Sequence, residues 1–305
     1  MSVTVYLCLA LVAVFGAVAP RLARRLPPVA AVWLLSAGAV AGAAAGCAAL
    51  VLLSLPLVGQ LPQIAQLGGW SSSVLALDDP VRTPIAVGAA ILFTAGALRA
   101  ARAGAVELSS RRRSRELAGE LPAGDELAVI DDPGRRYAFA LAGRPGRIVV
   151  SSGMLRAMQP AQRRALLAHE RAHLRYRHDL HRAVVRICAA ACPSLYALPA
   201  ASRLACERWA DEAAAARTDR AAVAAALTVA ARSQTRAPLQ PMVMAMAVEA
   251  VALRVLALRA PQPRLRPWLM LVPAALLVAV AACDANALLE LHRIFQRAHA
   301  ALAAR

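Results

Sequence analysis

The chain has 305 residues, of which 59% are hydrophobic and 17% are charged, with a formal net charge of +17 and a mean hydropathy of +0.53. Water-soluble domains usually have about a quarter charged residues, so this composition excludes a simple soluble domain and predicts a membrane protein. Every one of the 35 basic residues is Arg, which is typical of the codon bias of a high-GC bacterium and does not predict direct nucleic-acid binding.

Four apolar stretches predict four transmembrane helices. Residues 3–19 form an uncharged run near the lower limit for crossing about 30 Å of hydrocarbon. A signal peptide is the competing interpretation, but no basic segment precedes this run and Arg21, Arg24 and Arg25 follow it, so a retained span is preferred. The other three predicted spans are 29–58, 84–98 and 267–283.

The second predicted span carries three glycines spaced four residues apart. Gly38, Gly42 and Gly46 would share one helix face, and small residues at this spacing let another helix approach closely. Packing against a neighbouring span of the same chain is the preferred interpretation. A homodimer through this face is the alternative.

The distribution of Arg predicts the orientation of the spans. Arg is concentrated in residues 20–28, 99–115 and 259–266, whereas residues 59–83 contain only one. Because Arg is enriched on the cytoplasmic side of membranes, both termini are expected outside and the segment 99–266 in the cytoplasm. The pattern therefore predicts a multi-pass protein of the bacterial plasma membrane, in contact with membrane lipid.

This prediction divides the chain into three parts. Residues 1–99 hold three transmembrane helices, and residues 100–262 form a cytoplasmic domain inserted between helices three and four. Residues 263–305 hold the fourth transmembrane helix and a short extracytoplasmic tail. The fold class is α+β and mostly helical.

The cytoplasmic domain is expected to begin with strands and to continue with helices. Short β-branched or aromatic runs between Pro-Gly turn signals predict strands at 127–130, 137–141 and 147–151. Periodic Ala-rich and Leu-rich stretches predict helices at about 160–177, 201–217, 220–233 and 242–259. The apolar run 183–199 is interpreted as a buried or membrane-apposed helix.

A metal-binding motif lies in the predicted helix 160–177. The sequence H-E-R-A-H at 169–173 places His169 and His173 one turn apart on one helix face, so both imidazoles can reach a single Zn²⁺. Glu170 between them would lie beside the metal as the catalytic base. A solvated charged face on an Arg-rich helix is the alternative interpretation.

The next predicted helix supplies further candidate site residues. A catalytic zinc site usually has three protein ligands, and Glu207 is the candidate third ligand. Asp211, one turn later, is placed to accept the N–H of a ligating histidine. We therefore predict one Zn²⁺ per chain, with no other cofactor.

Several residues outside these motifs are not assigned a specific role in the metal site. His178 and His181 have no matching carboxylate partner in the sequence and are expected at the surface or at an interface. The six cysteines form no CxxC pair and are expected to be buried free thiols. Arg217 and Arg220 lie in the right region for a second oxyanion donor, which the sequence does not identify.

The combination of H-E-R-A-H at 169–173 with E-R-W-A-D at 207–211 resembles the gluzincin membrane peptidases. The layout is most similar to that of BlaR/MecR-like membrane metallopeptidases, which place this cytoplasmic domain between the third and fourth spans. The stretches GRIVVSSGML at 146–155 and HLRYRHD at 173–179 add to the similarity. The related HtpX/CAAX-type membrane proteases share both motifs.

The resemblance implies a zincin-like metalloprotease domain that hydrolyses a protein or peptide substrate, and in signalling members a BlaI/MecI-type transcriptional repressor. Antibiotic-sensing members carry a large extracellular domain after the fourth span, which residues 284–305 are too few to form, so penicillin sensing is not expected. HtpX-like quality control of membrane proteins is the enzymatic alternative. A non-catalytic zinc-binding membrane signal transducer is the non-enzymatic alternative.

Overall fold

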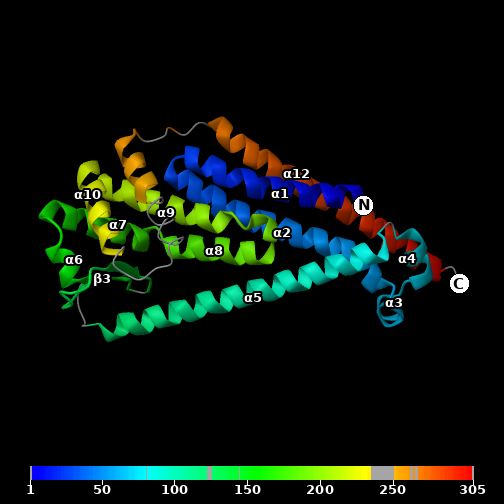
Figure 1. Cartoon of the computed structure of the whole chain (residues 1–305). Helices are drawn as coiled ribbons and strands as arrows, with labels where there is room; N and C mark the ends of the chain where they lie inside the picture. The colour runs from blue at the N-terminus through cyan, green and yellow to red at the C-terminus, as the bar shows by residue number, and fades with distance from the viewer. Residues whose placement is uncertain are drawn as a thin grey trace.

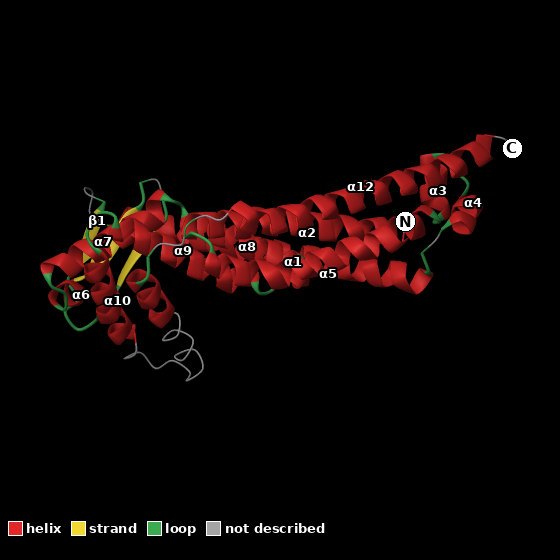
Figure 2. Cartoon of the chain, turned by 90° about the horizontal axis from the view of Figure 1, so that it is seen from above, coloured by secondary structure: helices red, strands yellow, loops and turns green. Residues whose placement is uncertain are grey.

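The computed structural model describes residues 2–79, 81–121, 126–143, 145–234, 251–261, 264 and 267–303. This part of the chain is mostly helical, as expected. Long helices run side by side along an elongated body, and a small sheet with shorter helices lies at one end (Figures 1 and 2).

Four helices are long and apolar enough to cross a membrane. They are α1 (Ser2–Arg25), α2 (Pro28–Gly59), α5 (Thr83–Glu120) and α12 (Pro267–Ala303). They include the four predicted spans, but α5 and α12 continue well beyond them. The 38 residues of α5 rise roughly 57 Å, about twice the thickness of the hydrocarbon core.

The continuation of α5 has a local cause. Residues 99–120 contain no proline and are rich in Ala, Arg, Glu and Leu, which are strong helix formers, so the helix does not end where the apolar run ends. The boundary expected near residue 100, between the transmembrane helices and the cytoplasmic domain, therefore falls inside a single helix. The segment 59–83 contains the short helices α3 (Pro62–Gly68) and α4 (Ser72–Asp78).

The glycine face of α2 packs against other parts of the same chain. Gly38 faces the ring of Phe15 in α1, and positions 42 and 46 lie next to Leu195 and Cys192. This arrangement agrees with the preferred interpretation of the spacing. A homodimer through this face would have to replace these contacts.

A helical hairpin inserts its tip among the long helices. It consists of α8 (His178–Ala191), the short helix η1 (Pro193–Leu195) and α9 (Leu198–Ala215). The carbonyl oxygen of Ser194 lies against Gly16 of α1, and that of Ala191 lies against Gly96 of α5. The apolar run 183–199 is therefore packed against the bundle, as expected from its composition, but it forms the end of α8, a turn and the start of α9 and not the single helix that was predicted.

The close approach of α5 to the hairpin leads to a testable prediction. A methyl group at position 96 would collide with the backbone of Ala191, so Gly96→Ala should destabilise the protein by about 1–3 kcal/mol. Position 88 of the same helix has no neighbour within 4 Å, so Gly88→Ala is the matched control. Thermal unfolding in detergent should show a lower midpoint for the first variant only, and equal midpoints would contradict the packing described.

The sheet has three strands in the order β1-β3-β2. These are β1 (Leu127–Ile130), β2 (Ala138–Leu141) and β3 (Arg147–Ser151), at the predicted positions. The strand β3 pairs in parallel with β1 and antiparallel with β2. Among the described strands, β2 pairs on one side only, so its other edge has no partner strand.

Helices cover one side of the sheet and form a second apolar core. These helices are α7 (Pro160–Arg175) and α10 (Arg220–Gln234), and the short helix α6 (Ser152–Arg156) precedes them in the chain. The core contains Ile148, Val150, Met154 and Val223. The predicted helix 242–259 is helical over 251–259, while 242–250 lie outside the described residues.

Candidate metal centre

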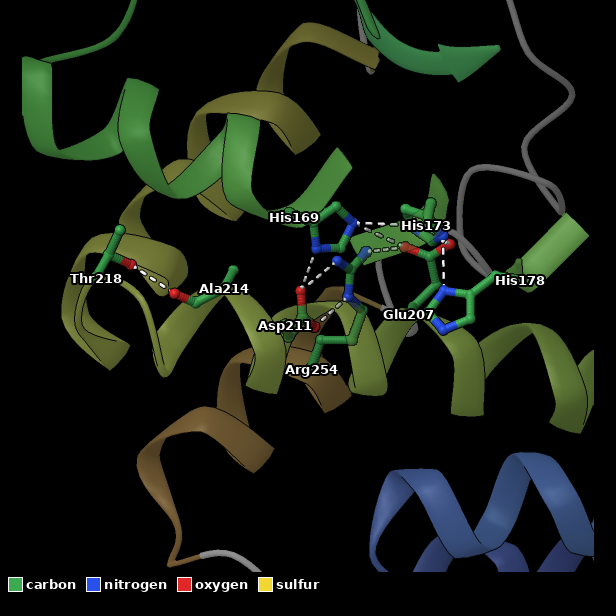
Figure 3. A network of polar contacts seen from close by, with 8 residues as sticks. All are labelled: His169, His173, His178, Glu207, Asp211, Ala214, Thr218 and Arg254. Carbon is green, nitrogen blue, oxygen red and sulfur yellow. Dashed lines mark hydrogen bonds and ion pairs between the residues drawn. The ribbon is translucent and has the colours of Figure 1, made fainter. Parts of the chain in front are cut away.

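Two helices bring the motif residues together. Pro160 occupies the first turn of α7, where its missing N–H costs no hydrogen bond, and the helix buries Ala165, Ala168 and Ala172. His169 and His173 therefore project from one face toward α9. Glu207 of α9 meets them there, as Figure 3 shows.

The three side chains have the spacing of a tetrahedral metal site. Nε2 of His169 lies 3.1 Å from Nε2 of His173, and the carboxylate oxygens of Glu207 lie 3.5 Å and 3.7 Å from these two atoms. Ligand atoms bound to one tetrahedral zinc ion at about 2.0–2.1 Å are roughly 3.3 Å apart. The three residues therefore fit a zinc ion, and they form the one candidate metal cluster among the described residues.

Asp211 fixes the orientation of His169. Its Oδ1 atom lies 3.0 Å from Nδ1 of His169, so the imidazole carries its hydrogen on Nδ1 and directs the Nε2 lone pair toward the metal position. Burial disfavours the charged imidazole, but hydrogen bonds to Asp211 and Glu207 raise the pKa of His169 to about 10, so a bound metal ion would displace a proton from Nε2. Burial and the neighbouring His169 lower the pKa of His173 to about 4.

An arginine that the sequence analysis missed holds both carboxylates of α9. Nε and Nη2 of Arg254 donate to Asp211 at 2.8 and 2.7 Å, and its Nη1 atom lies 3.1 Å from Glu207 Oε2. Burial raises the pKa of both carboxyl groups, but hydrogen bonds and the charge of Arg254 outweigh it and lower both pKa values. Nothing in its sequence context distinguishes this Arg from the others.

His178 differs from its expected place at the surface, and that expectation was wrong. It is only 1% exposed, and its Nδ1 atom lies 3.0 Å from Nδ1 of His173. With a metal ion on Nε2 of His173, the hydrogen of that ring would lie on Nδ1, from which it would be donated to His178. The ring of Trp209 lies beside His178, with 5.0 Å between ring centroids. His181 is half-buried and contacts Ser36 of α2.

Glu170 points into a cavity beside the three candidate ligands. It is 9% exposed, and burial raises its pKa, while the charge of His169 and, to a smaller extent, a hydrogen bond from the backbone of Ala140 oppose that rise. The cavity has a volume of about 420 Å³ and is lined by residues of β2, α7, α9 and α10 together with Arg254. A buried carboxylate with a raised pKa suits a group that accepts and returns a proton.

Neither arginine considered as an oxyanion donor lines this cavity. Arg220 binds Glu212 at 2.7 Å and donates to the carbonyl oxygens of Leu258 and Ala260. Arg217 is also absent from the described lining, which includes Arg136 and Arg182 instead.

The hydrogen bond between Asp211 and His169 leads to a second prediction. Asp211→Asn keeps the size of the side chain but weakens the partner of His169, so zinc affinity should fall by about 10- to 100-fold. Asp219→Asn, beyond the end of the same helix, is the control. Competition with a coloured chelator measures both affinities, and equal values would show that Asp211 does not position the ligand.

Two histidines and a carboxylate around one cavity, with a buried glutamate next to them, form the site of a metallopeptidase. Residues 105–260, just over half of the chain, match the sequence model of peptidase family M48, and the chain belongs to this family. The comparison with curated proteins found no match. The comparison with solved structures also found none.

Proposed function

We propose that this metallopeptidase is a zinc-dependent endopeptidase that cuts protein substrates next to the cytoplasmic face of a bacterial plasma membrane. The convergence of His169, His173 and Glu207 beside Glu170 is the observation that supports it most strongly. A purely structural zinc site would not need a buried carboxylate between its histidines.

Each residue of the site has a defined part in this proposal. His169, His173 and Glu207 would hold one zinc ion, which would supply Lewis acidity to the scissile carbonyl and to the attacking water. Glu170 accepts a proton from that water and passes it to the leaving amine nitrogen. Asp211, Arg254 and His178 hold the ligands in position.

The edge of β2 without a partner strand is the proposed place for the substrate backbone. Residues 136–140 line the same cavity as Glu170, and β2 pairs with β3 on its other side. An extended peptide can add to such an edge through main-chain hydrogen bonds. A segment bound there would pass directly beside the catalytic group, which favours cleavage within a chain.

The membrane location rests on the four candidate spans. Charged contacts attach α8, which packs between the metal-binding helices and the bundle, to the extended part of α5, because Arg111 lies 3.2 Å from Asp179 and Glu107 pairs with Arg186. The Arg-rich ends of the apolar segments support a cytoplasmic site. The metal centre therefore lies close to the membrane surface in this arrangement.

Two classes of substrate have separate support. The order of the elements, with the metal-binding helices between the third and fourth long helices, matches the BlaR/MecR-like layout and supports a soluble repressor. The attachment of the site to the bundle supports segments of membrane proteins, as in HtpX-like quality control. Both are protein substrates for the same chemistry.

Reconstitution in lipid vesicles tests the proposal. Wild type and Glu170→Gln are incubated with an unfolded soluble protein and with the same sequence fused to a membrane anchor, and new termini are identified by mass spectrometry. We expect internal cuts by wild type only. Preference for the anchored form would favour membrane-protein substrates, and release of single terminal residues would contradict the endopeptidase assignment.

A further inference from the structure

A second cavity lies on the outside of the bundle, away from the metal centre. It has a volume of about 400 Å³ and is formed by the last turns of α1 and the first half of α9. Most of its lining is small and apolar, including Pro20, Ala197, Ala200 and Leu204. Two cationic side chains, Arg24 and Arg208, complete it.

Charged and apolar groups occupy opposite ends of this cavity. In α1, Arg24 lies one turn beyond Pro20, toward the C-terminal end of the helix at Arg25. Along α9, Arg208 lies about three turns beyond Ala197, the residue that precedes the helix. The two arginines therefore lie at the end toward the metal centre. The apolar residues lie at the end toward the hairpin tip, which is packed among the candidate membrane spans.

The charges of Glu212 and Asp211 act on Arg208 at the cationic end, but these two carboxylates form their ion pairs with Arg220 and Arg254. Arg208 donates to carbonyl oxygens at the end of α1, at 3.3 Å to Ala23 and 3.4 Å to Leu26. Such contacts fix the guanidinium without neutralising it. Arg24 is exposed beside it, so two positive charges face one opening.

An aromatic side chain lies at the apolar end. Tyr196 is 80% exposed although it borders the tip of a hairpin packed among apolar helices. The sequence of groups along the cavity is therefore aromatic, apolar and then cationic.

We propose that this cavity binds one anionic phospholipid, with its phosphate on Arg24 and Arg208 and an acyl chain along Ala197, Ala200 and Leu204. The inference goes beyond the proposed peptidase activity and rests only on the placement of α1 in a membrane. Basic pockets beside membrane helices on the cytoplasmic side bind anionic headgroups, and each Arg strengthens binding by roughly fivefold.

Native mass spectrometry of the delipidated full chain in detergent tests this proposal without any cleavage assay. Phosphatidylglycerol and phosphatidylcholine with identical acyl chains are the probes, and glycerol phosphate is the probe without chains. We expect one phosphatidylglycerol to bind with at least about tenfold preference over phosphatidylcholine. Glycerol phosphate should bind much more weakly than the lipid.

Variants locate the site. Arg24→Gln and Arg208→Gln should each weaken binding of phosphatidylglycerol by about fivefold, and Ala200→Phe should weaken binding by filling the apolar end. Arg25→Gln and Arg203→Gln remove exposed charges from the same two helices outside the lining, and they should leave the affinity within about twofold. Because Arg24 and Ala200 are exposed, their replacement leaves the fold intact, which thermal unfolding checks.

Three results would overturn the proposal. Equal affinity for the two lipids would remove the role of the phosphate charge. Equal losses in the control and cavity variants would show a general surface effect. Binding of glycerol phosphate as tight as that of the lipid would assign the cavity to free phosphates. Since peptidase activity enters none of these readouts, failure here leaves the proposed function untouched.

Discussion

Replacement of Glu170 by Gln is expected to lower kcat/KM for peptide hydrolysis by about 10²–10⁴-fold, the usual contribution of a general base. The amide keeps the size of the side chain but cannot accept a proton from water. Zinc should remain bound, because the three proposed ligands are unchanged. Initial cleavage rates and zinc content, measured on the same preparations, check both parts of this prediction.

The matched control is Glu116→Gln, which removes an exposed carboxylate of α5 outside the cavity and should leave cleavage unchanged. The variant and its control carry the same change in charge, so a general effect of charge cannot explain a difference between them. Normal cleavage by zinc-loaded Glu170→Gln would contradict the catalytic assignment. This result would favour the alternative function of a zinc-binding signal transducer.

Replacement of Arg254 by Gln is expected to destabilise the protein by about 3–5 kcal/mol, the usual cost of breaking a buried ion pair. Asp211 is 2% exposed, and its carboxylate would lose two charge-assisted hydrogen bonds while remaining buried. Glu207 would lose a cation 3.1 Å away. Zinc affinity should fall as well, because both carboxylates act on the metal ligands.

The control for this variant is Arg259→Gln, which removes an exposed charge from the same helical segment 251–259. Chemical unfolding in detergent gives the free-energy difference, and chelator competition gives the zinc affinity. Arg254→Gln should lower both quantities and Arg259→Gln neither. Equal stability of the two variants would show that Arg254 does not hold the carboxylates of α9.

Local sequence patterns predict well the helices that apolar runs define and the strands that turn signals separate. Apolar runs mark the four long helices, and turn signals between β-branched runs place the three strands. Helix ends are harder to predict, because α5 continues through residues 99–120 on helix propensity after its hydrophobic pattern has ended. Apolar composition shows where a helix can enter a membrane, but it does not show where that helix stops.

The same holds for the site: local motifs predict some of its residues, and contacts between distant segments of the chain supply the others. The spacing within α7 places two histidines on one face, and a second motif supplies Glu207 and Asp211. Arg254 reaches the site from a helix 43 residues beyond Asp211, and nothing local marks its role. His178 looked unpartnered because its partner, His173, is a histidine and not a carboxylate.

Zinc analysis of the purified full chain and of His169→Ala tests the central claim most directly. The proposed site predicts about one zinc ion per chain in the wild type. The variant should lose it, because two remaining ligands hold zinc poorly. His292→Ala, which changes a histidine of α12 outside the site, should retain the metal. A wild type that binds no zinc, or a His169→Ala variant that keeps it, would contradict the metal centre described above.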